Sequence, residues 1–175
     1  MRLLPGLVAT TLLLTLSTGP AAAHGDPTAP GGQRVLAGPL GAVLTTQSLL
    51  EAGVVAELNR ARLRAGCRAA VAVSGLRVAA RRHSSLMARR VQLSHRLTGE
   101  ATLARRTAAA GYTGSTLLGE VIAAGPRSPY DVVRSWLGSA PHRALLLDCR
   151  FRHVGAGVAG SSDRRRWWTV DLGRR

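Results

Sequence analysis

The sequence predicts a single α+β domain, and three observations lead to that class. Between residues 48 and 110, apolar residues recur at the three- and four-residue spacing of amphipathic helices. Between residues 117 and 172, short apolar runs bounded by glycine, proline and polar turns are typical of strands. About 130 residues follow the N-terminal region, a length that suits one domain with one core. Helices that precede and flank a few strands define the α+β class.

Three helices are expected in the first half of the domain. Ser48 and Glu51 have the spacing of a capping box, and the apolar pattern behind them predicts a helix over 48–65. An apolar stripe with arginines on the opposite face predicts a second helix over 79–91. A third, short helix is expected over 100–110, because glycine follows it directly.

The second half of the domain alternates strands and short helices. The apolar run 117–124 predicts a buried strand, and a proline at the first helical position predicts a helix over 128–137. A short turn or helix is expected over 142–147. Two further strands, 154–159 and 167–172, are joined by a polar turn.

The N-terminus predicts a secreted, extracellular protein. Residues 1–23 have the charged start, short apolar region and small-residue cleavage site of a signal peptide, and we expect cleavage after Ala23. The apolar run 7–16 is shorter than the roughly 20 residues that span a bilayer, although an uncleaved anchor is the alternative. Residues 24–47 have the composition of a flexible linker, which leaves the domain to residues 48–175.

The charge of the chain predicts an anionic partner. All 24 basic residues are arginine, and the formal net charge is +15. A surface of this charge attracts polyanions, and export favours an anionic envelope polymer, a lipid or a protein as the partner of a monomeric chain. Nucleic acid is not expected, because aromatic residues make up only 3% of the chain and do not interleave with the basic ones.

The two cysteines predict a disulfide. An exported chain with an even number of cysteines usually pairs them, so we expect a Cys67–Cys149 bond. Closure of a loop of about 82 residues stabilises the folded state by roughly 4–5 kcal/mol in the chain-entropy model. In that case neither cysteine is available as a nucleophile or a metal ligand.

Three polar residues are the candidates for chemistry: His95, Glu120 and His142. Glu120 lies within an apolar strand-like run, where burial without a partner is costly, so its carboxylate must reach solvent or meet a partner. The alternative is a hydrogen bond from Glu120 to neighbouring backbone. If the fold brings the three residues together, the two imidazoles could bind a divalent cation and the carboxylate could take part in proton transfer.

Other histidine and tryptophan residues are expected to be structural. His83 lies beside Met87 on the apolar side of its helix and is interpreted as a packed or hydrogen-bonding residue rather than a ligand. Trp136 is expected in the core or in a cleft wall. Trp167 and Trp168 are adjacent on a strand, so one should face inward and the other outward.

Seven ordered fragments carry a resemblance to a known family. They are residues 57–62, residues 80–84 with Met87, residues 94–95, Arg106 with residues 110–112, residues 119–120, residues 136–143 and residues 154–158. Together they resemble the CAP superfamily of SCP-like, cysteine-rich secretory protein-type domains, in its bacterial secreted branch. The resemblance covers nearly all of residues 48–175.

This resemblance implies a three-layer α-β-α sandwich with a large cleft. His95, Glu120 and His142 match cleft positions of the family, in which a pair of histidines can hold a divalent cation. Ser139 replaces a second glutamate, and Val121 stands where the family has asparagine. The reduced polar set predicts at most a weakly bound cation at His95 and His142, for which zinc is more plausible than calcium.

The sequence therefore favours a secreted binding module that engages a cell-envelope component, a lipid or another protein. It contains no Gly-x-Ser-x-Gly motif, and both cysteines are expected to be paired. The alternative is a metal-assisted hydrolase, peptidase- or esterase-like, with Glu120 as the general base and His95 and His142 binding the metal. A third hypothesis is attachment to the envelope by charge alone.

Overall fold

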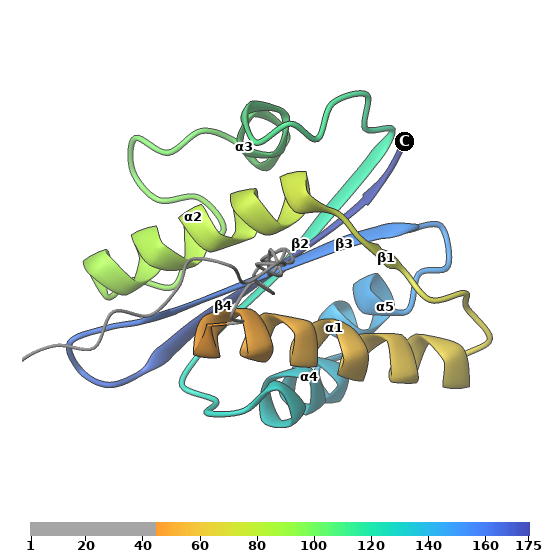
Figure 1. Cartoon of the computed structure of the whole chain (residues 1–175), viewed down its shortest axis with the longest axis horizontal. Coiled ribbons are helices and arrows are strands. Elements are labelled where there is room, and N and C mark those ends of the chain that lie inside the picture. Colours follow the sequence, from red (N-terminus) through yellow and green to blue (C-terminus); the bar gives the residue numbers. More distant parts are fainter. Residues whose placement is uncertain (1–44) are drawn as a thin grey trace, which may run out of the picture. The chain divides into compact units, whose positions relative to one another are not determined.

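The computed structural model describes residues 45–175, which form five helices and a four-stranded sheet (Figure 1). In chain order these elements are α1 (Thr46–Arg64), β1 (Val71–Ala72), α2 (Ser74–Arg90), α3 (Leu103–Ala109), β2 (Leu117–Ala124), α4 (Pro129–Gly138), α5 (Ala140–Leu146), β3 (His153–Gly160) and β4 (Arg166–Arg174). The predicted signal peptide, its cleavage site and residues 24–44 of the predicted linker lie outside the described residues. None of the described helices has the length and apolar character to cross a membrane.

The sheet has the strand order β1-β3-β4-β2. The long strands β3 and β4 form an antiparallel hairpin, β2 pairs antiparallel with β4, and the two-residue β1 pairs parallel with β3. In this register Glu120 of β2 lies opposite Asp171 of β4, which in turn lies opposite Gly155 of β3. The three predicted strands are thus confirmed, and β1 is an addition that its two residues gave no pattern to predict.

Helices cover both faces of the sheet, so the predicted three-layer α-β-α sandwich is confirmed. Helices α2 and α3 lie over one face, and α1, α4 and α5 lie over the other (Figure 1). Each interface has its own apolar cluster. The larger cluster, on the α1 and α4 side, includes Leu58, Trp136 and Val170, and the smaller one, on the α2 side, includes Met87 and Ile122.

The two adjacent tryptophans of β4 correct one prediction. Trp167 and Trp168 do point to opposite faces of the sheet, as the strand period requires. Both are nevertheless buried, because Trp167 joins the α2-side cluster and Trp168 joins the cluster under α1 and α4. The expectation of one exposed ring was wrong because a sheet covered on both faces has no outward side.

Two glycines of β3 allow α2 to lie directly on the sheet. A Cβ atom on Gly155 would lie 2.1 Å from the backbone nitrogen of Arg77, and one on Gly157 would lie 2.3 Å from the carbonyl carbon of Ala80. Helix and strand therefore meet backbone to backbone at these positions, where no other residue fits. This close approach brings the side chains of α2 over the centre of the sheet.

The start of α1 differs from the predicted capping box. The helix begins at Thr46, and the side chain of Thr45 accepts the capping hydrogen bond from the backbone N–H of Ser48. Glu51 points into the protein, where the Arg81 Nε lies 2.8 Å from both of its carboxylate oxygens. Glu51 cannot close a capping box because its carboxylate is bound to α2.

The outer edge of β3 is covered by side chains of α1 beyond the two residues that pair with β1. The Gln47 Nε2 donates to the Val158 carbonyl at 2.7 Å, and the Val158 N–H donates to a Glu51 oxygen at 3.4 Å. Side-chain amide and carboxylate groups thus replace a neighbouring strand along this part of the edge.

Helix α3 also starts later than expected. It begins at Leu103, with the Thr102 side chain accepting from the Arg105 N–H, rather than at Glu100. Glu100 remains in the preceding loop because its carboxylate accepts from the Leu97 N–H at 3.0 Å and contacts His83. A local side-chain bond therefore competes successfully with the helix.

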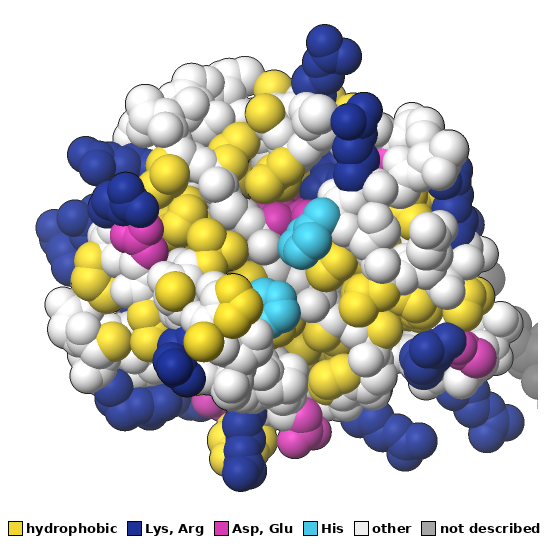
Figure 2. Space-filling view, turned by 180° about the vertical axis from the view of Figure 1, so that it is seen from behind, with side chains coloured by type: hydrophobic (Ala, Val, Ile, Leu, Met, Phe, Trp, Pro, Cys, Tyr) yellow, Lys and Arg dark blue, Asp and Glu magenta, His cyan; other side chains and the backbone are white. Residues whose placement is uncertain are grey.

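One face of the domain combines charged and apolar side chains (Figure 2). Arginines project around its rim, and two histidine side chains lie near its centre beside a recessed acidic side chain. Apolar side chains surround these central groups. The face therefore presents polar groups in an apolar setting with positive charge at its margin.

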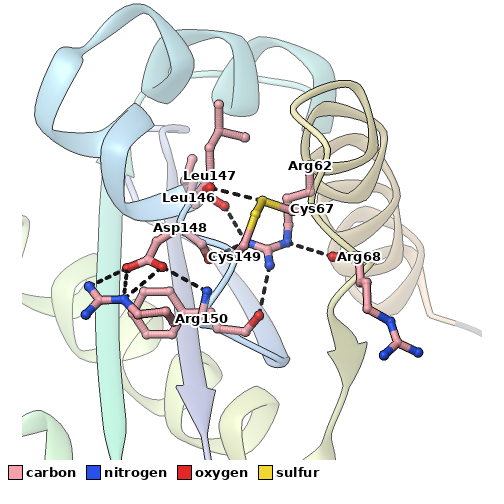
Figure 3. The surroundings of a disulfide bond; sticks show 9 residues. Arg62, Cys67, Arg68, Leu146, Leu147, Asp148, Cys149 and Arg150 are labelled. Carbon is pink, nitrogen blue, oxygen red and sulfur yellow. Dashed lines mark hydrogen bonds and ion pairs between the residues drawn. A yellow bond between two sulfur atoms is a disulfide. The ribbon is translucent and has the colours of Figure 1, made fainter.

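The predicted Cys67–Cys149 disulfide is present and joins the segment after α1 to the segment after α5 (Figure 3). Beside it, the fully buried Arg62 sends its guanidinium toward the same loop. This side chain donates to the carbonyls of Leu146 at 2.7 Å and Phe151 at 2.8 Å. One covalent and one hydrogen-bonded link therefore connect α1 to the α5–β3 loop.

Candidate functional site

The three predicted site residues come from separate parts of the fold. His95 lies in the loop between α2 and α3, Glu120 lies in β2, and His142 lies in the first turn of α5. His95 is exposed, whereas the Glu120 side chain is only 4% exposed. Two of the three, His95 and Glu120, are in direct contact.

Both carboxylate oxygens of Glu120 have hydrogen-bond partners. The Oε1 atom lies 2.9 Å from the His95 Nδ1, and the Oε2 atom accepts from the Arg106 guanidinium. The His83 Nε2 lies 3.8 Å from Oε2. Glu120 was expected to need a partner, and it has two, the Arg106 guanidinium and the His95 imidazole. The alternative, a hydrogen bond from Glu120 to neighbouring backbone, is not present among residues 45–175.

Arg106 is the centre of this network. It projects from α3, its side chain is 8% exposed, and it donates both to Glu120 and to the main-chain carbonyl of His95, the latter at 3.0 Å. Its guanidinium also lies 3.2 Å from the Glu100 carboxylate. Arg106 thus fixes the backbone that carries His95 and the carboxylate that orients the His95 ring.

His83 and Glu100 form the inner layer of the network. The buried His83 Nδ1 lies 2.7 Å from a Glu100 oxygen, and because an ionised carboxylate can only accept, the ring nitrogen donates in this bond. The same nitrogen lies 3.1 Å from the Arg106 guanidinium. The predicted role of His83 as a packed, hydrogen-bonding residue is therefore confirmed. Its Nε2 is buried without a hydrogen-bond partner among the described residues and faces Glu120.

The charge of Glu100 is stabilised by these contacts. Burial raises the pKa of its carboxyl group, but the hydrogen bonds from the Leu97 N–H and from His83 lower it. The charges of His83 and Arg106 lower it further, so that the pKa of Glu100 lies below its ordinary value. Glu100 is thus an ionised partner for Arg106 and His83 at neutral pH.

The loop that carries His95 is shaped by local sequence. Helix α2 ends at Arg90, and Val91 adopts a left-handed backbone with φ of 50°, which turns the chain away from the helix axis. The Ser94 hydroxyl donates to the Arg96 carbonyl at 2.8 Å, and the Leu97 side chain is buried under the loop. These anchors place His95 over β2, where it meets Glu120.

His142 lies on the other side of β2. Helix α5 covers the sheet at Gly119, where an added Cβ would meet the Leu145 side chain at 2.8 Å, whereas Glu120 projects from the opposite face. The His142 ring is half-buried and forms no hydrogen bond with residues 45–175. His95 and His142 therefore flank β2 from its two faces, and the network of Glu120 reaches only His95.

The residues present do not form a complete protein site for a divalent cation. Residues 45–175 contain no group of three or more His, Cys, Asp or Glu side chains placed to bind a metal together. The Arg106 guanidinium occupies the Glu120 oxygen that faces the interior, which disfavours a second cation there. A cation bound by His95 and His142 would depend on water for its other ligands, and it stays a prediction, as does the implied cleft.

The arrangement presents one nitrogen of His95 to solvent. Because the Nδ1 atom lies 2.9 Å from a carboxylate, it carries a proton and donates to Glu120. The Nε2 atom is then the outward-facing nitrogen of a ring fixed in tautomer and orientation. Such a ring can accept a hydrogen bond from a ligand or, when protonated, offer it a positive charge.

Sequence reasoning missed Arg106 and Glu100 as site residues, and it did not consider Asp171. Glu100 was expected at the start of a helix, and Arg106 was named only among the fragments of the family resemblance, without a role in the site. Asp171 could have been found, because it is a carboxyl group in an apolar strand, which is the same signal that identified Glu120. It is fully buried and lies opposite Glu120 in the sheet.

Comparison with known proteins gives a family match over most of the domain. The family model of CAP, the cysteine-rich secretory protein family, matches residues 55–172. Among curated proteins, the uncharacterized protein YkwD of Bacillus subtilis (strain 168) is 42% identical over 43 residues, which are 25% of this chain and 17% of that protein. The chain thus matches only a small part of that relative.

Solved structures of similar fold come from bacterial surface and extracellular proteins. An extracellular protein containing an SCP domain from Bacillus anthracis is 25% identical, with a TM-score of 0.66 over 74% of this chain and 41% of that one. An outer surface protein from Borrelia burgdorferi is 20% identical, with a TM-score of 0.63 over 70% of this chain and 90% of that one. The second similarity concerns the fold alone.

Proposed function

Because the chain belongs to the CAP family of cysteine-rich secretory proteins, we propose that it is an extracellular binding module that engages an anionic polymer of the cell envelope through its arginines. The extracellular location is supported by the N-terminal signal-like sequence and by the similar proteins, which are described as extracellular or outer-surface. The anionic partner is argued from the charges of the domain.

The observation that carries the proposal is the excess of arginines over acidic residues, because the few acidic side chains already have partners within the domain. Residues 45–175 contain 22 arginines and eight acidic residues. Six of the acidic side chains form ion pairs with arginine, and these are Glu51, Glu57, Glu100, Glu120, Asp148 and Asp163. Of the other two, Asp131 accepts from Ser128 and Asp171 is buried. Most arginines therefore have no carboxylate to neutralise them.

Each of two surface hollows is lined by three arginines, two of which form no ion pair with a carboxylate among residues 45–175. One, of about 380 Å³, is lined by Arg81, Arg82 and Arg89 of α2 together with Gln47 and Ser85. In the other, of about 480 Å³, Arg150, Arg174 and Arg175 lie with Thr116 and Leu117. Guanidinium groups bind phosphate and carboxylate in a bidentate manner, so each hollow suits one or two negative groups of a chain molecule.

The geometry of Glu120 favours binding over hydrolysis. A general base needs an oxygen that can reach a substrate proton, but both Glu120 oxygens already have partners and the side chain is almost completely buried. Glu120 is better suited to orienting His95. In the proposed module the exposed His95 ring adds a directional polar contact to the less specific attraction of the arginines.

The proposal is tested by binding of a poly(glycerol phosphate) chain, measured by isothermal titration calorimetry at several salt concentrations. Affinity should fall about tenfold or more between 50 and 200 mM salt, because each phosphate contact releases counterions. The double variant Arg82→Gln/Arg89→Gln removes two arginines without an ion-pair partner. In this variant the negative slope of log K against log salt should become shallower by about 1.5.

The matched control removes the same charge from paired arginines. Arg60 and Arg165 form ion pairs with Glu57 and Asp163, so Arg60→Gln/Arg165→Gln lowers the net charge equally but leaves the hollows intact. This control should bind more tightly than Arg82→Gln/Arg89→Gln. Binding that is insensitive to salt, or equal loss in both double variants, would contradict the proposed use of the hollows.

A further inference from the structure

Sheet register places a second carboxyl group beside Glu120. Asp171 of β4 is the direct partner of Glu120 of β2. Residues opposite each other on neighbouring antiparallel strands project from the same face, with Cβ atoms about 4.5–5.5 Å apart. The two carboxyl groups therefore lie side by side on the α2 face of the sheet.

Asp171 is unlike every other acidic residue of the domain in its surroundings. Its side chain is fully buried, and neither of its oxygens has a hydrogen-bond donor among residues 45–175. Two ionised carboxylates in contact within an apolar interior repel each other strongly, and one of them normally keeps its proton. Glu120 has Arg106 to balance its charge, so Asp171 is the member of the pair that keeps the proton.

We propose that Asp171 is a positioning residue of the site, a neutral carboxylic acid whose O–H donates a hydrogen bond to Glu120. This bond removes one of two adjacent negative charges and gives Glu120 a partner on the sheet in addition to Arg106 and His95. Glu120 then stays directed at His95. The inference concerns how the site is assembled and does not depend on which partner the domain binds.

The charged and titratable groups around Asp171 and Glu120 come from helices α2 and α3 and from the loop that connects these helices. They are His83 from α2, Arg106 from α3, and Glu100 and His95 from the loop. On the side of β3, Asp171 faces Gly155, which has no side chain to titrate. Burial raises the pKa of Asp171 well above its ordinary value and the charge of Glu120 raises it further, while Arg106 offsets only part of the increase.

The proton on Asp171 has a consequence for stability. The folded chain keeps this proton at pH values at which the unfolded chain has already lost it, since an unperturbed aspartate titrates near pH 3.9. Asp171 therefore makes a contribution to the free energy of unfolding that falls as the pH rises from about 4 through its folded-state pKa. In Asp171→Asn the amide N–H donates to Glu120 without titrating, and this fall should be absent.

The direct experiment is carbon-13 NMR of the aspartate side-chain carboxyl groups of the wild-type protein during a pH titration. At about pH 5 Asp163 should be ionised, because its hydrogen bond with Ser161 lowers the pKa of its carboxyl group, whereas Asp171 should still be protonated. Titration of Asp171 together with Asp163 would overturn the proposal. This measurement needs no variant, so it remains decisive if a substitution prevents folding.

Two substitutions distinguish the hydrogen bond that Asp171 donates to Glu120 from the space that its side chain fills. Asp171→Asn keeps a hydrogen-bond donor toward Glu120, and Asp171→Leu keeps a similar volume without one. The nitrogen-15 shifts of the His95 ring should remain as in the wild type in Asp171→Asn and should change in Asp171→Leu, because Glu120 loses a partner. Asp131→Asn serves as the control for loss of an aspartate far from the site and should leave the His95 shifts unchanged. Loss of the wild-type His95 shifts in Asp171→Asn would contradict the proposed role.

Discussion

Arg62 is a cation whose buried guanidinium is bound by main-chain carbonyl groups. Besides Leu146 and Phe151, it donates to the Asp148 carbonyl at 3.1 Å. Burial lowers the pKa of Arg62 and the neighbouring Arg152 lowers it further, while the Asp148 charge acts in the opposite direction. The residue is stabilised in the interior because it satisfies carbonyls of a loop that has no regular structure to bind them.

Substitution of Arg62 tests this role. In Arg62→Met the apolar part of the side chain is retained, but four main-chain carbonyls, two of them in fully buried contacts, lose a donor. The free energy of unfolding should therefore fall by at least about 3 kcal/mol. Urea denaturation followed by circular dichroism measures the change. Arg64→Met, at an exposed position of the same helix, should change the free energy by less than about 0.5 kcal/mol. Similar losses in both variants would show that the carbonyl contacts contribute little.

The polar network around Glu120 shows which contacts of a residue can be predicted from its place in the sequence and which cannot. The need of Glu120 for a partner follows from its place in an apolar strand, and the structure supplies one. Which arginine meets it could not be predicted, because Arg106 is one of 24 chemically identical residues and only the fold selects it. Asp171 carries the same local signal as Glu120, and its pairing with Glu120 requires the strand register.

At the scale of secondary structure elements, the contact between α2 and β3 determines the position of the site. Side chains of α2 reach the centre of the sheet because Gly155 and Gly157 allow direct backbone contact. Ser84 of α2 uses this proximity: its hydroxyl donates to the Gly157 carbonyl at 3.1 Å and lies 2.9 Å from the Thr169 hydroxyl, which can donate to it. The position of His83, one residue earlier, depends on the same contact.

A methyl group at Gly157 should push α2 away from the sheet. In Gly157→Ala the new Cβ would overlap the backbone at Ala80, so we expect a loss of about 1–3 kcal/mol or more in the free energy of unfolding. Thermal unfolding by calorimetry gives the comparison. Gly160→Ala is the matched control on the same strand, because a Cβ there meets no atom within 4 Å. A stable Gly157→Ala protein would mean that α2 can shift without cost.

Element types were largely predictable, but their starting points were not. Apolar spacing identified α1, α2 and the long strands, since these segments bury one or both faces. The start of α1 depends on Thr45 and that of α3 on Thr102, while the acidic residues that suggested earlier or different caps bind partners elsewhere in the fold. Long-range ion pairs and hydrogen bonds therefore overrode local capping patterns.

At the scale of the whole molecule, the Cys67–Cys149 bond closes a loop over most of the domain, with a sequence separation of 82 residues. In the chain-entropy model such a loop contributes about 4–5 kcal/mol by restricting the unfolded chain. The contacts of Arg62 join the same two segments without a covalent bond. Two different links therefore constrain the same pair of segments.

Removal of the disulfide should weaken the domain without changing its fold. For Cys67→Ser/Cys149→Ser we expect the free energy of unfolding to fall by about 4 kcal/mol, measured by urea denaturation at neutral pH. Because Arg62 still connects α1 to the α5–β3 loop, the circular dichroism spectrum should match that of the wild type. The reference is the wild type with its disulfide intact, denatured in urea without a reductant. A decrease below about 1 kcal/mol would indicate that the unfolded chain is already restricted in that loop.

The covered edge of β3 affects how molecules of this protein meet one another. A strand edge with free N–H and carbonyl groups can recruit a strand from another chain and start an ordered aggregate. Here Gln47 binds the carbonyl of Val158 and Glu51 binds its N–H, so an incoming strand would first have to displace two side chains of α1. The same contacts that complete the fold thereby keep neighbouring copies from joining their sheets at this edge, even where the protein accumulates at high local concentration.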